Sequence, residues 1–93
     1  MSNNIRDECD RLSRHAEKLA IMHRAFYFQR AGPWELFARF SGNAMWNYGV
    51  SKDFLRLSVR LERCAAGKGT DESCQTALNE FERLDRMTAE AMR

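Results

Sequence analysis

The chain has few residues that interrupt helices, because it contains one proline and five glycines among 93 residues. It also lacks the sustained alternation of apolar and polar residues that is typical of a strand, so no strand is predicted. What remains is helices joined by short turns. We therefore expect an all-α fold, a small bundle that forms a single helical domain over residues 1–93.

Signals for export or membrane insertion are also missing. No apolar run approaches the ~20 residues of a membrane span, and Arg6, Asp7 and Glu8 stand where a signal peptide needs an apolar core. We therefore expect a cytoplasmic protein without a membrane partner.

The chain contains three cysteines, Cys9, Cys64 and Cys74. Reduced thiols are the default in that compartment. The sequence leaves open whether Cys64 and Cys74 pair.

No motif for catalysis, cofactor binding or metal binding is present. The stretch Gly67-Lys68-Gly69-Thr70 lacks the spacing of a phosphate-binding loop. The cysteines and histidines show no Cys-x-x-Cys or His-x-x-x-His spacing that would gather zinc ligands. A nucleophile, a base and an orienting group with local support are not found either. The expected protein has no catalytic residues, no cofactor and no metal.

What the sequence does contain is helical periodicity in four segments. Residues 4–31 carry one apolar stripe at steps of three and four, the signature of a long N-terminal helix. Gly32-Pro33 ends it, and a second helix is expected from Pro33 to Tyr48, with Gly49 stopping it. Whether this second helix is continuous through Gly42 is left open. The first stripe consists of Ile5, Cys9, Leu12, Ala16, Leu19, His23 and Phe26.

The last two segments flank Gly67-Lys68-Gly69, the clearest turn in the chain. Ser51 is the expected cap of the third helix and Thr70 that of the fourth. Because the turn is short, these helices are predicted to pack as a C-terminal antiparallel αα-hairpin. Their apolar stripes are Phe54, Leu57, Leu61 and Cys64 in the third helix, and Cys74, Leu78, Phe81, Leu84 and Ala91 in the fourth.

Aromatic residues concentrate in the middle of the chain, where eight of the ten lie between Phe26 and Tyr48. One interpretation buries the second helix on all sides in the bundle. Another leaves several of these rings on the surface for a partner, because aromatics are enriched in binding hot spots. The first helix is also longer than its expected neighbours, so its stripe needs a further surface. The predicted partner contacts are Leu19, Met22, Phe26, Trp34 and Phe37.

A row of basic residues offers an alternative site. Lys52, Arg56, Arg60 and Arg63 share one face of the third helix, as contacts to nucleic-acid phosphates do. However, the net charge of the chain is only +2, and the acidic last segment would repel a phosphate backbone. A solvated face, or a surface for an acidic partner, is therefore favoured over nucleic acid.

These observations predict a small cytoplasmic regulatory protein that acts by protein–protein binding. Small bacterial helical proteins of this kind include inhibitors and antiactivators that cover the apolar dimerisation surface of a partner such as a transcription factor. The chain is also expected to be able to form a homodimer. The alternatives are a nucleic-acid-binding module that uses the third helix, and a secretion chaperone or structural subunit. The choice rests on analogy of size and architecture.

Overall fold

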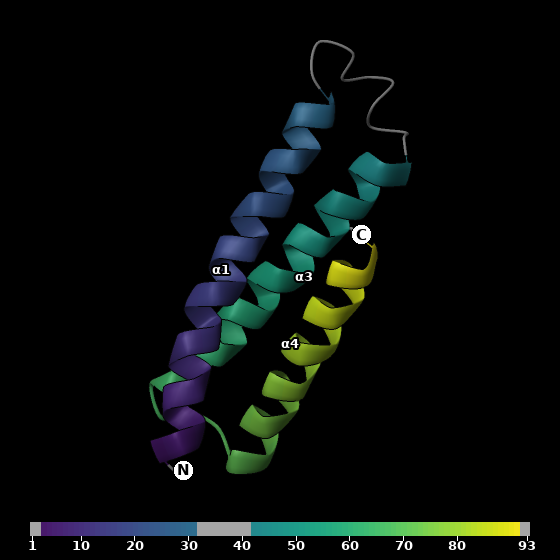
Figure 1. Cartoon of the computed structure of the whole chain (residues 1–93). Coiled ribbons are helices and arrows are strands. Elements are labelled where there is room, and N and C mark those ends of the chain that lie inside the picture. Colours follow the sequence, from purple (N-terminus) through teal and green to yellow (C-terminus); the bar gives the residue numbers. More distant parts are fainter. Residues whose placement is uncertain (1–2, 32–41, 92–93) are drawn as a thin grey trace.

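The computed structural model of the chain describes residues 3–31 and 42–91. These ranges form three helices, α1 (Asn3–Ala31), α3 (Gly42–Ala65) and α4 (Asp71–Ala91). The helices lie side by side with α3 running opposite to the other two (Figure 1). The all-α prediction is confirmed for the described residues, and so is the long N-terminal helix, since α1 has 29 residues.

The prediction of four helical segments is wrong at Gly49, because α3 continues through that residue. Gly49 is exposed, and a Cβ there would meet no atom within 4 Å. A mid-helix glycine costs about 1 kcal/mol relative to alanine. Burial of Val50 and Phe54 on the same helix face outweighs that cost. The predicted helix over 33–48 is thus replaced from Gly42 onward by α3, and its first part lies outside the described residues.

Ser51 was the predicted cap of the third helix, but it lies inside α3 and has another role. Its side chain is buried, and its hydroxyl donates a hydrogen bond of 2.8 Å to the carbonyl oxygen of Ala20 in α1. A buried hydroxyl needs such a partner. Ser51 therefore ties α3 to α1 instead of starting a helix.

The turn between α3 and α4 has the conformation that its glycines favour. Gly67 and Gly69 both adopt positive φ, 84° and 100°. The amide of Lys68 donates to the carbonyl of Arg63, and that of Gly67 to the carbonyl of Cys64, each at 3.0 Å. This pair of bonds is a Schellman motif, which satisfies carbonyls at the end of a helix. The chain then reverses, and α4 runs antiparallel to α3 as the sequence predicts (Figure 1).

Thr70 caps α4, as expected. Its hydroxyl oxygen accepts a hydrogen bond from the amide of Ser73 at 3.1 Å, and the Ser73 hydroxyl oxygen accepts one from the Thr70 amide at 3.1 Å. This reciprocal arrangement satisfies amides that the first turn of a helix leaves unpaired. Asp71 and Glu72 follow in the first turn, at the positive end of the helix dipole.

Cys64 and Cys74 form a disulfide across the turn, with their Cα atoms 5.8 Å apart. The sequence left this pairing open and took reduced thiols as the default, so the structure departs from that default. Cys9 is free and fully buried. Burial, followed by the charge of Glu8, raises the pKa of the Cys9 thiol, and this keeps it protonated and unreactive.

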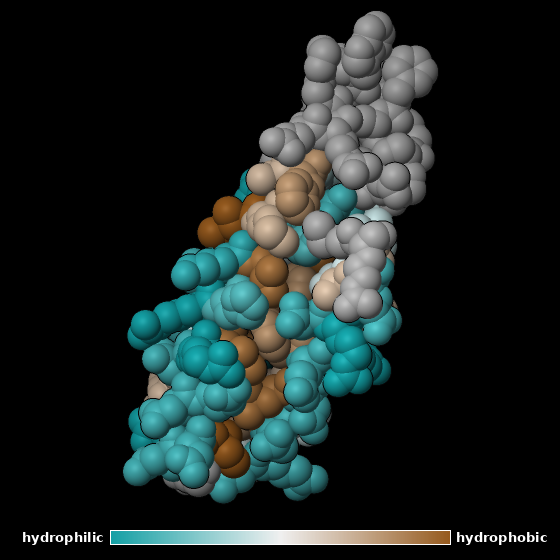
Figure 2. Space-filling view, viewed as in Figure 1, coloured by the Kyte–Doolittle hydropathy of each residue, from teal (hydrophilic) through white to brown (hydrophobic). Residues whose placement is uncertain are grey.

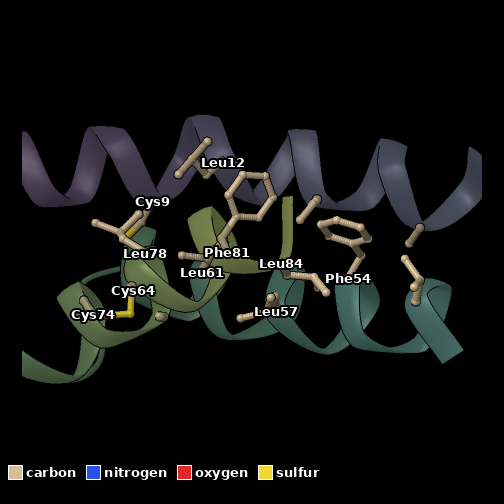
Figure 3. Packing of buried hydrophobic residues seen from close by; sticks show 14 residues of the cluster. Cys9, Leu12, Phe54, Leu57, Leu61, Cys64, Cys74, Leu78, Phe81 and Leu84 are labelled. Atoms are coloured by element: carbon tan, nitrogen blue, oxygen red, sulfur yellow. A yellow bond between two sulfur atoms is a disulfide. The ribbon is translucent and has the colours of Figure 1, made fainter. Parts of the chain in front are cut away.

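The apolar core runs along the line where the three helices meet (Figure 3). Phe54 of α3 and Phe81 of α4 pack with their ring centroids 5.9 Å apart. The predicted stripes supply most of the core, which confirms them, although Ala91 is exposed. The buried hydrophobic residues are Cys9, Leu12, Ala16, Ala20, Val50, Phe54, Leu57, Leu61, Cys64, Cys74, Ala77, Leu78, Phe81 and Leu84.

One polar pair lies inside this core. His23 of α1 is 1% exposed, and its Nδ1 lies 2.9 Å from Oδ1 of Asn47 in α3. Because an amide oxygen only accepts, Nδ1 carries the proton and donates. The imidazole stacks on Phe54 at 5.8 Å and meets the edge of Trp46 at 5.6 Å. The pair specifies which turn of α1 faces which turn of α3, because any slip would bury unpaired polar groups.

Replacing Asn47 by alanine is expected to lower the free energy of unfolding by about 1–3 kcal/mol, because the Nδ1–H group of His23 stays buried without its acceptor. The double variant His23→Phe/Asn47→Leu removes both polar partners and should lie closer to the parent than Asn47→Ala does. Urea unfolding followed by circular dichroism measures both. A double variant less stable than Asn47→Ala would show that shape, and not the hydrogen bond, dominates here.

Candidate protein-binding groove

A groove of about 590 Å³ lies between α1 and α4. On the face shown in Figure 2, an apolar band runs lengthwise between hydrophilic edges. Six residues of α1 and six of α4 line the groove, so it exists only because these two helices pack beside each other. The lining residues are Asn4, Ile5, Glu8, Arg11, Leu12 and His15 of α1, and Gln75, Leu78, Asn79, Phe81, Glu82 and Asp85 of α4.

The apolar lining comes from both helices. Ile5 and Leu12 are seven residues apart on α1, which places them along one line of the helix. Leu78 and Phe81 of α4 lie three residues apart and line the same groove. The His15 ring meets the Phe81 ring with centroids 5.7 Å apart. Phe81 is almost fully buried, so it supports the groove from beneath.

The edges of the groove are acidic. The charged lining residues are three carboxylates and one guanidinium: Glu8, Glu82, Asp85 and Arg11. Glu8 forms an exposed ion pair with Arg11 on the same helix. The hydrogen bond from this pairing, and then the charge of Glu8, raise the pKa of Arg11 above its ordinary value. Arg11 therefore offsets Glu8, and the α4 edge keeps the negative charge of the groove.

The predicted contacts on α1 continue this groove toward the C-terminal end of the helix. Leu19 follows Ile5 and Leu12 at the same spacing of seven, and it packs partly buried against the core. Met22 follows Glu8 and His15 at that spacing and is 36% exposed. Both therefore extend lines of α1 that border the groove.

The three remaining predicted contacts need separate description. Phe26 follows Leu19 after seven residues and is half-buried, with its ring edge-on to His23 at 6.0 Å. Trp34 and Phe37 lie outside the described residues. The structure thus brings Leu19, Met22 and Phe26 to one edge of α1.

Sequence reasoning missed the α4 side of the groove. This side carries the exposed polar residues Gln75, Asn79 and Glu82. In the sequence of a single helix, their pattern indicates only a face exposed to solvent. They become part of a groove only when α1 is placed beside them. The positions of Leu78 and Phe81 in the predicted apolar stripe were the one available signal.

The basic row of α3 is exposed along its length, as predicted: Lys52, Arg56, Arg60 and Arg63 are all exposed. Two of its members have partners within the chain. Nη1 of Arg60 lies 2.6 Å from Oε2 of Glu80 in α4, and Nζ of Lys52 lies 4.7 Å from the centroid of the Tyr48 ring. The carboxylate of Glu80 lowers the positive potential that a phosphate would meet on this face.

Within residues 3–31 and 42–91, no cluster of three or more His, Cys, Asp or Glu side chains is placed to hold a metal ion. None of the helices in these ranges has the length and apolar character that crossing a membrane requires. Comparisons with protein-family models, with curated proteins and with solved structures found no match to this chain.

Proposed function

We propose that this chain is a protein-binding domain whose α1–α4 groove receives an amphipathic helix of a partner protein. The observation that carries the proposal is the groove between α1 and α4, along which an apolar band is visible between hydrophilic edges (Figure 2). An amphipathic helix that lays its apolar face into such a groove is a recurring mode of peptide recognition. Half-buried Ile5 would contact that apolar face. Leu12 and Leu78, which are only 9% and 8% exposed, would form the floor of the groove under it. Leu19 and Met22 would extend the contact along α1.

The charge of the edges indicates the chemistry of the partner. Glu82 and Asp85 make the α4 edge negative, so a matching helix carries lysine or arginine beside its apolar stripe. Complementary charge of this kind speeds association and selects the partner more than it adds affinity. We therefore propose a basic amphipathic helix as the ligand.

Binding of this kind would suit a regulatory role. A helix held in the groove has its apolar face covered and is unavailable for its own dimerisation. We propose that the protein inhibits its partner in this way, as an antiactivator of a transcription factor would. A secretion chaperone would use the same groove, but it would bind its partner before that partner folds. Binding to the folded, active partner distinguishes the inhibitor.

The nucleic-acid alternative receives less support. Arg60, in the middle of the basic row, already pairs with Glu80.

The cytoplasmic location stays a prediction. It can be tested through the Cys64–Cys74 disulfide, because disulfides are rare in the cytosol of most organisms. Alkylation of thiols in intact native cells, followed by mass spectrometry, would show whether this bond exists in the compartment where the protein works.

Met22→Arg is expected to weaken binding of the native partner by about 1–4 kcal/mol, the range of a central contact. The change puts a charged side chain at one end of the apolar band and adds a positive charge that repels a basic helix. Met22 is 36% exposed, so the melting temperature should barely change. The partner is captured from native cells by the parent protein, purified, and titrated by calorimetry against parent and variant.

Ile21→Arg is the matched control. Ile21 is 63% exposed, and it lies roughly 100° around α1 from Met22, away from the line of Glu8 and His15. It should bind the captured partner like the parent. Equal affinity of Met22→Arg and the parent would remove the groove from the proposed function. Equal loss in both variants would show that the substitution, and not its place, matters.

A further inference from the structure

A second apolar surface lies on α3, on the side turned away from α4. The exposed fractions of Leu55 and Val59 are 53% and 50%. Tyr48 lies on the same face and is 39% exposed. Leu57 and Cys64 are buried, and Cys64 is bonded to α4. Residues two positions apart on a helix differ by roughly 200°, so Leu55 points away from the side that Leu57 buries. Apart from the ring of Tyr27 in α1, whose centroid lies 5.3 Å from that of Tyr48, the described part of the chain leaves this surface uncovered.

These residues belong to a regular repeat. From Tyr48 to Ala66 the steps along this line of α3 are four, three, four, three and four, which is the a/d spacing of a coiled coil. Ala66 directly follows the last residue of α3, and its amide still donates a hydrogen bond to the carbonyl of Glu62, so the line continues to the turn. We call this set the outer seam. Its members are Tyr48, Lys52, Leu55, Val59, Glu62 and Ala66, and all six are exposed.

The outer seam is complementary to itself when it is reversed. Pairing it antiparallel with a second copy about its centre sets Leu55 against Val59 of that copy. The same register sets Lys52 against Glu62, and large Tyr48 against small Ala66. Each pair occurs twice because of the twofold symmetry. In an antiparallel coiled coil, an a position of one helix meets a d position of the other, and these pairs obey that rule.

A parallel pairing would be unfavourable, because it would place Lys52 against Lys52 and Glu62 against Glu62. Such like-charge layers at a helix interface select against that arrangement. Arg56 flanks the seam near its centre, so the two copies of Arg56 come near each other at the solvent edge. There the charges are screened at physiological salt, with a Debye length of about 8 Å.

We propose that the protein forms a homodimer through the outer seam, with the two α3 helices antiparallel. This interface lies on the face of α3 opposite α4, so the α1–α4 groove stays open in both copies. The dimer therefore presents two grooves that point in opposite directions. The proposal does not depend on what the grooves bind.

Charge exchange at the Lys52–Glu62 layer tests the proposal. Lys52→Glu and Glu62→Lys each place like charges opposite one another twice, and each is expected to raise the dimer dissociation constant about tenfold or more. The double variant Lys52→Glu/Glu62→Lys restores opposite charges and should return to within about threefold of the parent. Sedimentation equilibrium at ~0.15 M salt, without reductant, measures each constant.

Two controls and one variant in the middle of the outer seam complete the experiment. Arg86→Glu and Glu90→Lys reverse exposed charges on α4, away from the seam, and should leave the constant unchanged. Leu55→Asp should give a monomer with parental helix content by circular dichroism, because Leu55 is half exposed. A parent that stays monomeric throughout the accessible concentration range would overturn the proposal. So would a dimer that ignores the single reversals, or one that the double variant does not restore.

Discussion

Phe81→Ala is expected to lower the free energy of unfolding by about 3–5 kcal/mol, the range for a buried phenylalanine. Phe81 is 3% exposed and projects from α4, where it meets Phe54 of α3 at 5.9 Å and His15 of α1 at 5.7 Å. Truncation therefore leaves a cavity at the junction of all three helices. A domain of this size has a total stability of about 5–10 kcal/mol, so the variant would be close to unfolding at moderate temperature.

Urea unfolding followed by circular dichroism gives this difference. Leu61→Ala, at a fully buried position of α3, should cost about 2–5 kcal/mol. Met87→Ala is the control on α4, because Met87 is 55% exposed and an ordinary surface change costs within about 0.5 kcal/mol. A Phe81 variant as stable as the Met87 variant would mean that α4 does not pack on the other two helices as Figure 3 shows.

Reducing the Cys64–Cys74 disulfide is expected to destabilise the fold by about 3 kcal/mol. The bond closes a loop over a sequence separation of 10, and in the chain-entropy description a closed loop of this length contributes about that much. The effect arises mainly because the unfolded chain regains freedom, so the helix content of the folded protein should stay unchanged. Chemical unfolding with and without a strong thiol reductant measures the difference.

The double variant Cys64→Ser/Cys74→Ser separates this effect from other actions of the reductant. It should unfold like the reduced parent, apart from the cost of two buried hydroxyls, and it should not respond to reductant. Cys9 is free in either case, so it adds no bond to break. If mass spectrometry shows the parent to be reduced while its stability is unchanged, the bond does not constrain the unfolded chain.

Local rules predicted much of this fold. The stripe of α1, the turn at Gly67 and Gly69, the cap at Thr70 and the stripe of α4 follow from periodicity, from left-handed backbone at glycine and from capping chemistry. Each of these depends on residues close together in sequence. They were therefore accessible without knowing which helix packs against which.

The errors have a common physical cause. Gly49 and Ser51 carry local signals for a helix end and a helix start, yet α3 runs through both. Burial of neighbouring side chains against α1 outweighs the small local preference of a glycine, and the Ser51 hydroxyl finds its acceptor on Ala20. Tertiary packing overrode propensity at this point.

The candidate sites depended still more on packing. An apolar stripe defines a helix face, but the neighbouring helix decides which flank of that face is covered. Leu55 and Val59 lie beside the predicted stripe of α3 and are half exposed, whereas Ala20, beside that of α1, is buried in the core. The α4 residues of the groove could be identified only after α1 and α4 were known to lie side by side.

The sequence by itself determined that the chain is helical, where its clearest turn lies and which side chains form most of the core, because those properties depend on neighbours within about one or two helical turns. Only the tertiary structure decided that α3 is continuous, that Cys64 and Cys74 meet, that His23 pairs with Asn47 and that a groove opens between α1 and α4. All of these depend on contacts between residues far apart in sequence, such as the separation of 10 between Cys64 and Cys74 and of 24 between His23 and Asn47. Their energies depend on how whole helices pack, which no local pattern records.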